Sequence, residues 1–355
     1  MNIIIPMAGR GSRLRPHTLT IPKPLIPVGG IPIVHRLVAD IAAVCGSSIE
    51  HIGFVTGDFG AETERELCEI AESFGAKGHI FHQLTPLGTG HAVLCAAPLL
   101  SGPTVVAFAD TLFRADFTIS PTDEGILWVK RIPNPEQFGV IKMNERSEII
   151  DFVEKPAEFV SDLAMIGIYY FKDGEALHKE LNYLVDHAVI KSGEYQLPDA
   201  LRRLTEKGTV FKPGEVQEWL DCGNKHVTVE TNARVLEYDQ MDGKLNTSES
   251  ALIEHSVVIP PCFIGDGAVI SNSVIGPHVS IGAGSIIKNS NIRNSIIQTN
   301  FFKFLGNDEL LYIFDLNNQW HLDIVLLPIL QTQLNGILDT ACRLNMVVLD
   351  EHLVI

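Results

Sequence analysis

Several features are scarce or absent in this sequence, and each absence excludes a class of protein. Among its 355 residues there is no run of roughly 18 uninterrupted apolar residues, the length that a membrane-spanning helix requires. The six cysteines lie far apart and form no C-x-x-C pair. This spacing is typical of reduced thiols and predicts neither a disulfide framework nor a zinc site.

Positive charge is also scarce. The chain carries 27 lysines and arginines against 43 aspartates and glutamates, a formal net charge of −16, and no basic run offsets it. We therefore expect neither nucleic acid nor an anionic membrane as a partner. A small anionic substrate stays compatible, because a few local cations can hold it. The N-terminal segment has no basic region and its apolar run stops at Gly9, so we expect no secretory signal and a cytoplasmic location.

The first 240 residues alternate short apolar runs with amphipathic stretches. Five runs rich in β-branched or aromatic residues predict strands over residues 3–6, 52–56, 80–83, 104–109 and 126–130. Three stretches with helical spacing predict helices over residues 33–44, 61–74 and 89–100. This alternation predicts an α/β domain over residues 1–240, a doubly wound Rossmann-like fold with a mostly parallel sheet and helices on both faces. Ligands bind such sheets at the carboxyl ends of the strands.

The pattern of apolar and small residues changes from about Ala251. Aliphatic residues recur every five or six positions and small residues follow them, as in Ile264-Gly-Asp-Gly-Ala-Val and Ile281-Gly-Ala-Gly-Ser-Ile. This hexapeptide repeat predicts a short left-handed parallel β-helix over residues 251–300, in which aliphatic side chains point inward and small residues turn the corners.

Residues 301–355 lack the repeat and begin with many large apolar side chains. Exposure of such a segment would promote aggregation. We expect this tail, a third region without an assigned architecture, to pack on the β-helix end, on the first domain or on another subunit. We also expect the chain to form a homo-oligomer and expect no chemistry in the tail.

A glycine-rich segment follows the first predicted strand. Gly9 and Gly11 let backbone N–H groups approach a polyphosphate, Arg13 adds a fork-shaped cation, and Lys23 adds a point charge between two prolines. The dinucleotide fingerprint G-x-G-x-x-G fails because position 14 is leucine, and no Walker G-K-[ST] is present. What the segment does contain is the string G-x-G-S-R-L-x-P-x-T followed by P-K-P.

This string resembles the signature of the sugar-1-phosphate nucleotidyltransferases, the NDP-sugar pyrophosphorylases. The resemblance continues in the right order with segments that resemble a base-reading loop, two metal-binding strand ends and a sugar pocket. They are Gln83-Leu-Thr-Pro-Leu-Gly-Thr-Gly-His-Ala, Phe108-Ala-Asp, Phe138-Gly-Val-Ile, Val153-Glu-Lys-Pro, Met165-Ile-Gly-Ile-Tyr and Trp219-Leu-Asp-Cys-Gly. The resemblance implies transfer of a nucleotidyl group to a sugar 1-phosphate, with pyrophosphate leaving in line. A C-terminal β-helix is a common appendage in that family.

The resemblance also implies roles for single residues. Arg13 would stabilise the leaving pyrophosphate, and Lys23 would bind phosphate at the attacking side. The implied nucleotide-binding residues are Ala8, Gly9, Gly11, Ser12, Gln83, Gly88 and Thr89. Gln83 would read the edge of a pyrimidine, with Gly88 leaving room for the base.

For the acceptor and the metal, the resemblance implies a further set of residues. Gly139, Glu154 and Lys155 would contact the sugar and its phosphate. Asp110 and Asp221 would bind a Mg²⁺ that bridges the two substrates, since hard carboxylates suit that cation.

Each of these residues also has a purely structural interpretation. Lys23 is compatible with an exposed loop lysine, and Asp110 and Asp221 with ordinary turn formers. We interpret His17 and His91, like the other histidines, as structural or surface residues, because no pair has metal-ligand spacing.

The resemblance favours UTP or dTTP as the nucleotide donor and glucose 1-phosphate or a close relative as acceptor. Three alternatives stay open: a bifunctional nucleotidyl- and acetyltransferase, which would need more coils; a mannose-1-phosphate guanylyltransferase, which has a different base-reading loop; and a non-catalytic regulatory relative. Ala109 and Thr111 depart from the family pattern near the expected ribose contacts. The pair Met165-Ile166 departs from it in the expected sugar pocket, so the sequence does not identify the sugar.

Overall fold

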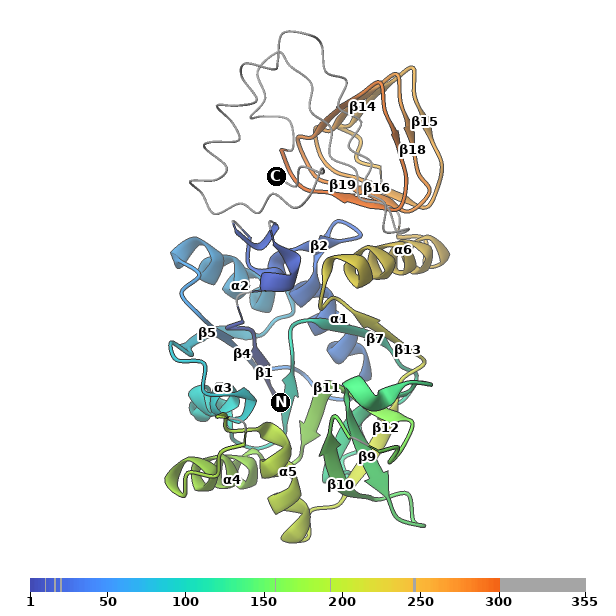
Figure 1. Cartoon of the computed structure of the whole chain (residues 1–355). Helices are drawn as coiled ribbons and strands as arrows, with labels where there is room; N and C mark the ends of the chain where they lie inside the picture. The colour runs from blue at the N-terminus through green and yellow to red at the C-terminus, as the bar shows by residue number, and fades with distance from the viewer. Residues whose placement is uncertain are drawn as a thin grey trace. The chain divides into compact units, whose positions relative to one another are not determined.

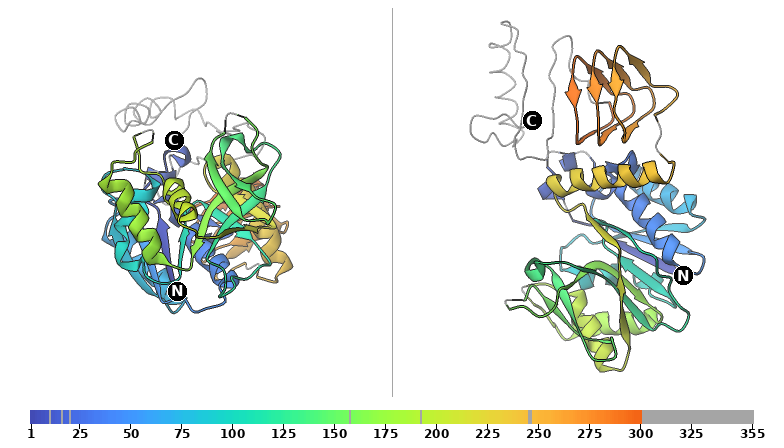
Figure 2. Two further views of the ribbon diagram at one scale, coloured as in Figure 1. Left: turned by 90° about the horizontal axis from the view of Figure 1, so that it is seen from below. Right: turned by 90° about the vertical axis from the view of Figure 1, so that its right-hand side faces the viewer.

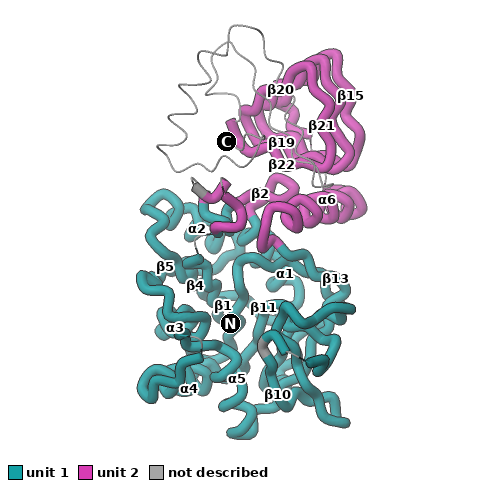
Figure 3. The backbone as a smooth tube through the Cα atoms, in the orientation of Figure 1, with its two compact units in different colours: residues 1–11, 22–25, 33–221 teal, residues 12–21, 26–32, 222–355 magenta. Residues whose placement is uncertain are grey.

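The computed structural model describes residues 1–300, apart from Arg10, Pro16, Thr20, Ala157, Ser192, Leu245 and Asn246. Residues 301–355 lie outside the described part of the chain, so the expected packing of this tail stays a prediction. The chain forms two compact units, and each unit is built from segments that are not contiguous in the sequence (Figure 3). Unit 1 contains residues 1–11, 22–25 and 33–221, and unit 2 contains residues 12–21, 26–32 and the chain from Cys222 onward. The predicted domain limits 1–240, 251–300 and 301–355 stay a prediction.

One half of the unit 1 sheet is parallel, as the sequence predicts. β1 (Asn2–Pro6) is buried along its length and pairs in parallel with β4 (His51–Thr56) and β6 (Thr104–Ala107). β4 in turn pairs in parallel with β5 (Lys77–His82). The predicted strands are confirmed here, because short apolar runs between helices have few alternatives in a buried sheet.

Helices cover both faces of this sheet (Figure 1). α1 (Ile33–Val44) and α2 (Ala61–Ser73) share one face, where the rings of His35 and Phe74 lie 4.9 Å apart. α3 (Thr89–Cys95) connects β5 back to β6, so a right-handed crossover places it on the opposite face. The remaining helices of unit 1 pack there with α3; they are α4 (Gly174–Asp186) and α5 (Leu197–Glu206).

The predicted helix over residues 89–100 was too long. α3 ends at Cys95, and a separate 3₁₀ turn follows over Ala97–Leu99. Pro98 has no N–H to donate to the carbonyl four residues back, and its ring crowds that carbonyl, so the α-helix stops before it.

The other half of the sheet corrects the expectation of a mostly parallel arrangement. The full order is β5-β4-β1-β6-β11-β8-β12-β10-β9. The strands added are β8 (Gly125–Arg131), β9 (Gly139–Met143), β10 (Ile149–Glu154), β11 (Leu163–Phe171) and β12 (Phe211–Glu215). Every new neighbouring pair is antiparallel except β8 with β12. No α-helix lies between residues 100 and 173 in the described part of the chain, so β8, β9, β10 and β11 follow one another through loops, which allow antiparallel pairing. β12 instead follows α4 and α5.

Unit 2 contains the predicted parallel β-helix. Its strands form three three-stranded parallel sheets, the faces of a stack of coils (Figures 1 and 2). They are β14 (Leu252–Glu254), β15 (Val257–Val258), β16 (Cys262–Ile264), β17 (Val269–Ser271), β18 (Val274–Ile275), β19 (Val279–Ile281), β20 (Ile286–Lys288), β21 (Asn291–Ile292) and β22 (Ser295–Ile297). Ile264, Ile281 and Ile297 are among the aliphatic residues that fill its core.

Stacked serines stabilise one corner of the coils. Ser256, Ser273 and Ser290 follow one another at intervals of 17 residues, one per coil. The backbone N–H of Ser273 donates to the hydroxyl of Ser256, and that of Ser290 to the hydroxyl of Ser273, both at 3.0 Å. Asn272 and Asn289, which precede two of these serines, adopt φ near +50°, a region that asparagine tolerates better than most residues. The prediction that small residues turn the corners is confirmed.

Two further elements complete unit 2: helix α6 (Lys225–Met241) and the hairpin of β2 (Pro27–Val28) with β3 (Ile31–Pro32). Asn232 of α6 is fully buried, and its Oδ1 accepts from the N–H of Gly29 at 2.9 Å and from the hydroxyl of Ser280 at 2.7 Å. A single amide therefore joins the helix, the hairpin turn and the β-helix.

Candidate active site

An ion pair lies at the carboxyl end of the parallel strands. Nζ of Lys23 donates to Oδ2 of Asp110 at 2.8 Å. Lys23 begins a short 3₁₀ turn between two prolines and is 13% exposed, whereas Asp110 follows β6 and is 46% exposed. The carboxylate therefore faces solvent on one side, where it can reach a ligand, while the ammonium is held beside it.

The glycine-rich segment begins at the same edge of the sheet. Ala8 and Gly9 follow β1, which lies directly beside β6. A methyl group at Gly9 would meet no atom within 4 Å, so the backbone there borders open space. Gly11 has φ +59°, a left-handed backbone conformation that glycine adopts without steric cost in a tight turn. Ser12 and Arg13 are exposed residues in a 3₁₀ turn of unit 2, Ser12–Leu14. Their predicted roles toward the triphosphate stay predictions.

Strand pairing brings the two predicted metal ligands to adjacent positions. β7 (Thr111–Arg114) runs antiparallel to β13 (Glu218–Asp221), with Thr111 opposite Asp221. Asp110 directly precedes Thr111, so carboxylates 111 positions apart in the sequence stand at neighbouring strand ends. No group of three metal-ligating side chains occurs among residues 1–300 as described. A pair of carboxylates fits Mg²⁺, which keeps several waters and completes its coordination with substrate phosphates.

The predicted base-reading residue is held by a network that the sequence did not reveal. Gln83 directly follows β5, and its backbone N–H donates to the carbonyl of Thr56 at 2.8 Å. Its side-chain Nε2 lies 3.0 Å from the carbonyl oxygen of Gly88 and 3.1 Å from Nδ1 of His91. Burial lowers the pKa of His91 below its usual value, which favours the neutral ring. The interpretation of His91 as an incidental histidine omitted this contact, although the residue lies within the L-G-T-G-H-A string.

Gly88 is required by close backbone packing. It has φ +103°, and a methyl group there would lie 2.6 Å from the carbonyl oxygen of Tyr195. The chain on either side of it is bonded to the same residue: Tyr195 N–H donates to Leu87 O, and Gly90 N–H donates to Tyr195 O, both at 2.8 Å. The glycine therefore serves this packing, and its predicted role in leaving room for a base stays a prediction.

The hydroxyl of Thr89 is engaged at the start of α5. It accepts from the backbone N–H of Leu197 at 3.0 Å and donates to Oε1 of Gln196 at 3.2 Å. The first N–H groups of a helix have no acceptor within the helix, and the hydroxyl oxygen of Thr89 is the acceptor for one of these groups. Its predicted contact with a nucleotide stays a prediction.

The predicted sugar-binding residues converge at the end of one strand pair. Gly139 of β9 lies opposite Glu154 of β10, and the N–H of Lys155 donates to the carbonyl of Phe138 at 3.2 Å. The ring of Phe138 packs edge-on against Trp219 of β13, with centroids 4.9 Å apart. This contact links the sugar segment to the strand that ends at Asp221.

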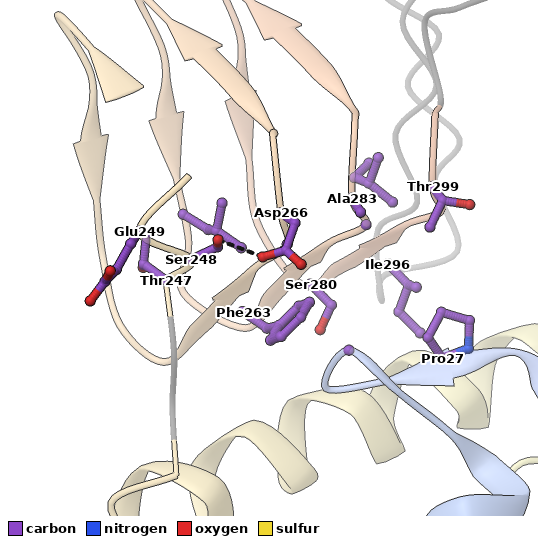
Figure 4. Close-up of a pocket in the computed structure, with 15 residues that line it drawn as sticks. Pro27, Thr247, Ser248, Glu249, Phe263, Asp266, Ser280, Ala283, Ile296 and Thr299 are labelled. Carbon is purple, nitrogen blue, oxygen red and sulfur yellow. Dashed lines mark hydrogen bonds between the residues drawn. The ribbon is translucent and has the colours of Figure 1, made fainter. Parts of the chain in front are cut away.

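A hollow of about 650 Å³ occurs within unit 2 (Figure 4). Pro27 of the hairpin and Phe263 and Ser280 of the β-helix line it, and the hydroxyl of Ser248 donates to Asp266 at 2.6 Å in its wall. No lysine or arginine is among its described lining residues. The hollow therefore does not fit a nucleoside triphosphate, which requires cations.

The fold and these side chains define a class of protein. A sheet whose carboxyl edge carries a glycine-rich turn, a lysine–aspartate pair and a second aspartate is suited to binding a nucleotide with a metal ion. The chain matches the nucleotidyl transferase family over residues 2–237 and belongs to that family. Of the helices that the structure describes, none has both the length and the apolar character to cross a membrane.

Known proteins with different functional names are similar to this chain in sequence. It is 30% identical over 261 residues to "Bifunctional protein GlmU" of Methanococcus aeolicus, an alignment that covers 73% of this chain and 60% of that protein. It is 28% identical over 290 residues to the glucose-1-phosphate thymidylyltransferase of Streptomyces griseus, covering 75% and 78%. The chain thus spans only about 60% of the length of the Methanococcus relative.

The fold also resembles a solved structure. A UDP-glucose pyrophosphorylase complexed with UDP-glucose superposes with a TM-score of 0.54 at 23% sequence identity, covering 67% of this chain and 98% of that one. The α/β architecture inferred from the sequence is confirmed by this likeness and by the family match.

Proposed function

We propose that the chain transfers a nucleotidyl group from UTP or dTTP to a sugar 1-phosphate, giving an NDP-sugar and pyrophosphate. The observation that carries the proposal is the pairing of Lys23 with Asp110 at the carboxyl edge of the sheet, with Asp221 on the adjoining strand. The Streptomyces relative and the superposed pyrophosphorylase are named for reactions of this type, which supports glucose 1-phosphate or a close relative as the acceptor.

The chemistry requires positioning and charge neutralisation more than a covalent nucleophile. The phosphate of the acceptor is already an anion, so its oxygen can attack the α-phosphorus without a general base. An ammonium has three hydrogens, and Lys23 gives one to Asp110. Among the described residues no further acceptor faces the other two, which can be donated to phosphate oxygens and would offset charge during the in-line displacement.

A divalent cation, which we propose to be Mg²⁺, fits the two carboxylates. When bound, it would supply charge neutralisation for both substrates. Asp110 and Asp221 would hold it, and Asp110 would at the same time orient Lys23. Ala8, Gly9, Gly11, Ser12 and Arg13 are proposed to contact the triphosphate, and Gly139, Glu154 and Lys155 the sugar phosphate. A cytoplasmic homo-oligomer stays a prediction.

The Methanococcus relative raises a second candidate, because its name describes a bifunctional protein. A second activity in this chain would be an acyl transfer that uses the β-helix. Each face of that β-helix has three stacked strands, which is fewer than we expect such a transferase to need, so the nucleotidyl transfer alone is the better supported proposal.

Pyrophosphate release with Mg²⁺ tests both candidates. UTP, dTTP, CTP, GTP and ATP are each combined with glucose 1-phosphate, N-acetylglucosamine 1-phosphate and mannose 1-phosphate. We expect release with UTP or dTTP and a gluco-configured acceptor. Preference for GTP with mannose 1-phosphate would indicate a guanylyltransferase, and no release in any combination would contradict the proposal and favour a non-catalytic relative. A parallel assay with acetyl-CoA and an amino-sugar 1-phosphate tests the second activity.

A further inference from the structure

We propose that His91 is a positioning residue that fixes the orientation of the Gln83 amide, so that its Oε1 faces the nucleobase and selects bases with a hydrogen on N3. These bases are uracil and thymine, and cytosine is disfavoured. The proposal rests on the proposed function, since it concerns how the nucleotide donor is chosen.

The orientation of the amide follows from its two neighbours. The carbonyl oxygen of Gly88 can only accept, so the Gln83 atom 3.0 Å from it must be the NH₂ group. The nitrogen and the oxygen of the amide are thus assigned from the hydrogen-bond partner, which is the sound basis for that assignment. The carbonyl of Gly88 is itself fixed, because the Leu87–Gly90 backbone is bonded on both sides to Tyr195.

His91 takes the second hydrogen of the same group. Its Nδ1 lies 3.1 Å from Nε2 of Gln83, so Nδ1 accepts and the ring hydrogen must be on Nε2. Burial lowers the pKa of His91, which favours the neutral ring that this arrangement needs. A flipped amide would place Oε1 against the carbonyl oxygen of Gly88 and lose that hydrogen bond, and it would keep a bond to His91 only if the ring hydrogen moved from Nε2 to Nδ1.

The remaining amide atom is therefore an acceptor. Gln83 is partly exposed, and no described residue donates to its Oε1. Uracil and thymine carry N3–H, which can donate to this oxygen. Cytosine presents a lone pair at N3, so two acceptors would face each other. A polar group that the bound base covers and leaves unpaired is a strong source of discrimination.

The test compares variants that keep or remove the acceptor at the position of Nδ1. His91→Asn places an amide oxygen near the position of Nδ1, whereas His91→Gln places its amide near that of Nε2. His91→Phe keeps an aromatic ring and has no acceptor. Cys95→Ala is the control for a change beside the ring, because Cys95 lies on the same helix with its Sγ 3.8 Å from the same nitrogen, and the substitution leaves the ring and its acceptor in place.

Dissociation constants for UTP and CTP are measured by calorimetry on the full chain, together with kcat/KM for each nucleotide. We expect the UTP-to-CTP ratio to fall about tenfold in His91→Phe and His91→Gln, which corresponds to roughly one lost hydrogen bond. The ratio should stay within about threefold of the parent in His91→Asn and Cys95→Ala, and in His91→Phe and His91→Gln the loss should appear in the dissociation constant for UTP more than in kcat.

An unchanged ratio in His91→Phe, with the parent still using UTP, would overturn this inference and leave the proposed function intact. An equal loss in His91→Asn and His91→Gln would overturn the assignment to Nδ1. A parent chain that binds no uracil or thymine nucleotide would overturn the inference and the proposed function together.

Discussion

Nζ of Lys23 lies 2.8 Å from Oδ2 of Asp110, although 87 residues separate the two in the sequence. The lysine comes from the connection between β1 and α1, and the aspartate from the end of β6. Because β1 and β6 are parallel neighbours, both connections leave the sheet at the same edge. The fold thus creates the pair, and the pair places a cation and an anion where a metal–phosphate substrate would bind.

Removal of the Lys23 ammonium should reduce turnover far more than stability. We expect Lys23→Ala to lower kcat on the order of 10²–10³-fold, the usual scale for the loss of one electrostatic stabiliser. Lys212→Ala is the matched control, since Lys212 forms a similar pair with Asp123 at 3.0 Å, at the opposite edge of the sheet. Steady-state kinetics of the two variants check this, and equal losses in both would contradict a role for Lys23 in the reaction.

Gly88 should tolerate no side chain. Gly88→Ala would place a methyl group 2.6 Å from Tyr195 O at φ +103°, so both contact and backbone conformation are unfavourable. Gly75→Ala is a control for the conformation alone, because Gly75 has φ +73° and open space around it. We expect Gly75→Ala to lower the free energy of unfolding by about 1 kcal/mol and Gly88→Ala by clearly more, measured by urea denaturation. Equal costs would show that the close approach to Tyr195 relaxes easily.

His17 should make the fold sensitive to acid. Burial, with a smaller effect from the charge of Lys225, lowers the pKa of His17 from 6.5 to about 4. The unfolded chain therefore binds a proton near pH 6.5 and the folded chain only near pH 4. The stability that this neutral histidine contributes is fully present above pH 6.5 and is lost as the pH falls toward 4.

Urea unfolding of the parent and of His17→Gln between pH 7.5 and 4 measures this effect. The parent should lose more stability over the interval than the variant, because other titrating groups are common to both. Identical pH slopes would show that His17 is accessible to protons in the folded state.

Much of the fold could be predicted because its signals are local. Strands such as β1 and helices such as α1 are specified by periodicity within a few residues, and the β-helix repeats the same short pattern. The direction of β11 was not predictable in this way, since pairing depends on the length of distant connections. Pro98 carried a local signal for the end of α3, which the helical spacing of its neighbours concealed.

The candidate site shows the same division. Asp110 and Lys23 could be predicted as site residues because they lie within short motifs, and the structure brings the two side chains together. The contact of His91 with Gln83 depends on how α3 follows β5, and motif matching did not separate this histidine from the others. The packing of Gly88 against Tyr195 joins segments more than a hundred residues apart, which spacing alone does not reveal.

The most direct test of the account is Mg²⁺-dependent pyrophosphate release from UTP and glucose 1-phosphate by the parent chain and by Asp110→Asn. The substitution keeps the size of the side chain and removes the charge that both Mg²⁺ and Lys23 require. We predict robust release by the parent, no release with EDTA, and loss of activity in Asp110→Asn at ordinary Mg²⁺ with the fold retained by circular dichroism. An Asp110→Asn variant that responds to Mg²⁺ as the parent does would show that the carboxylate is only a turn former and would contradict the site.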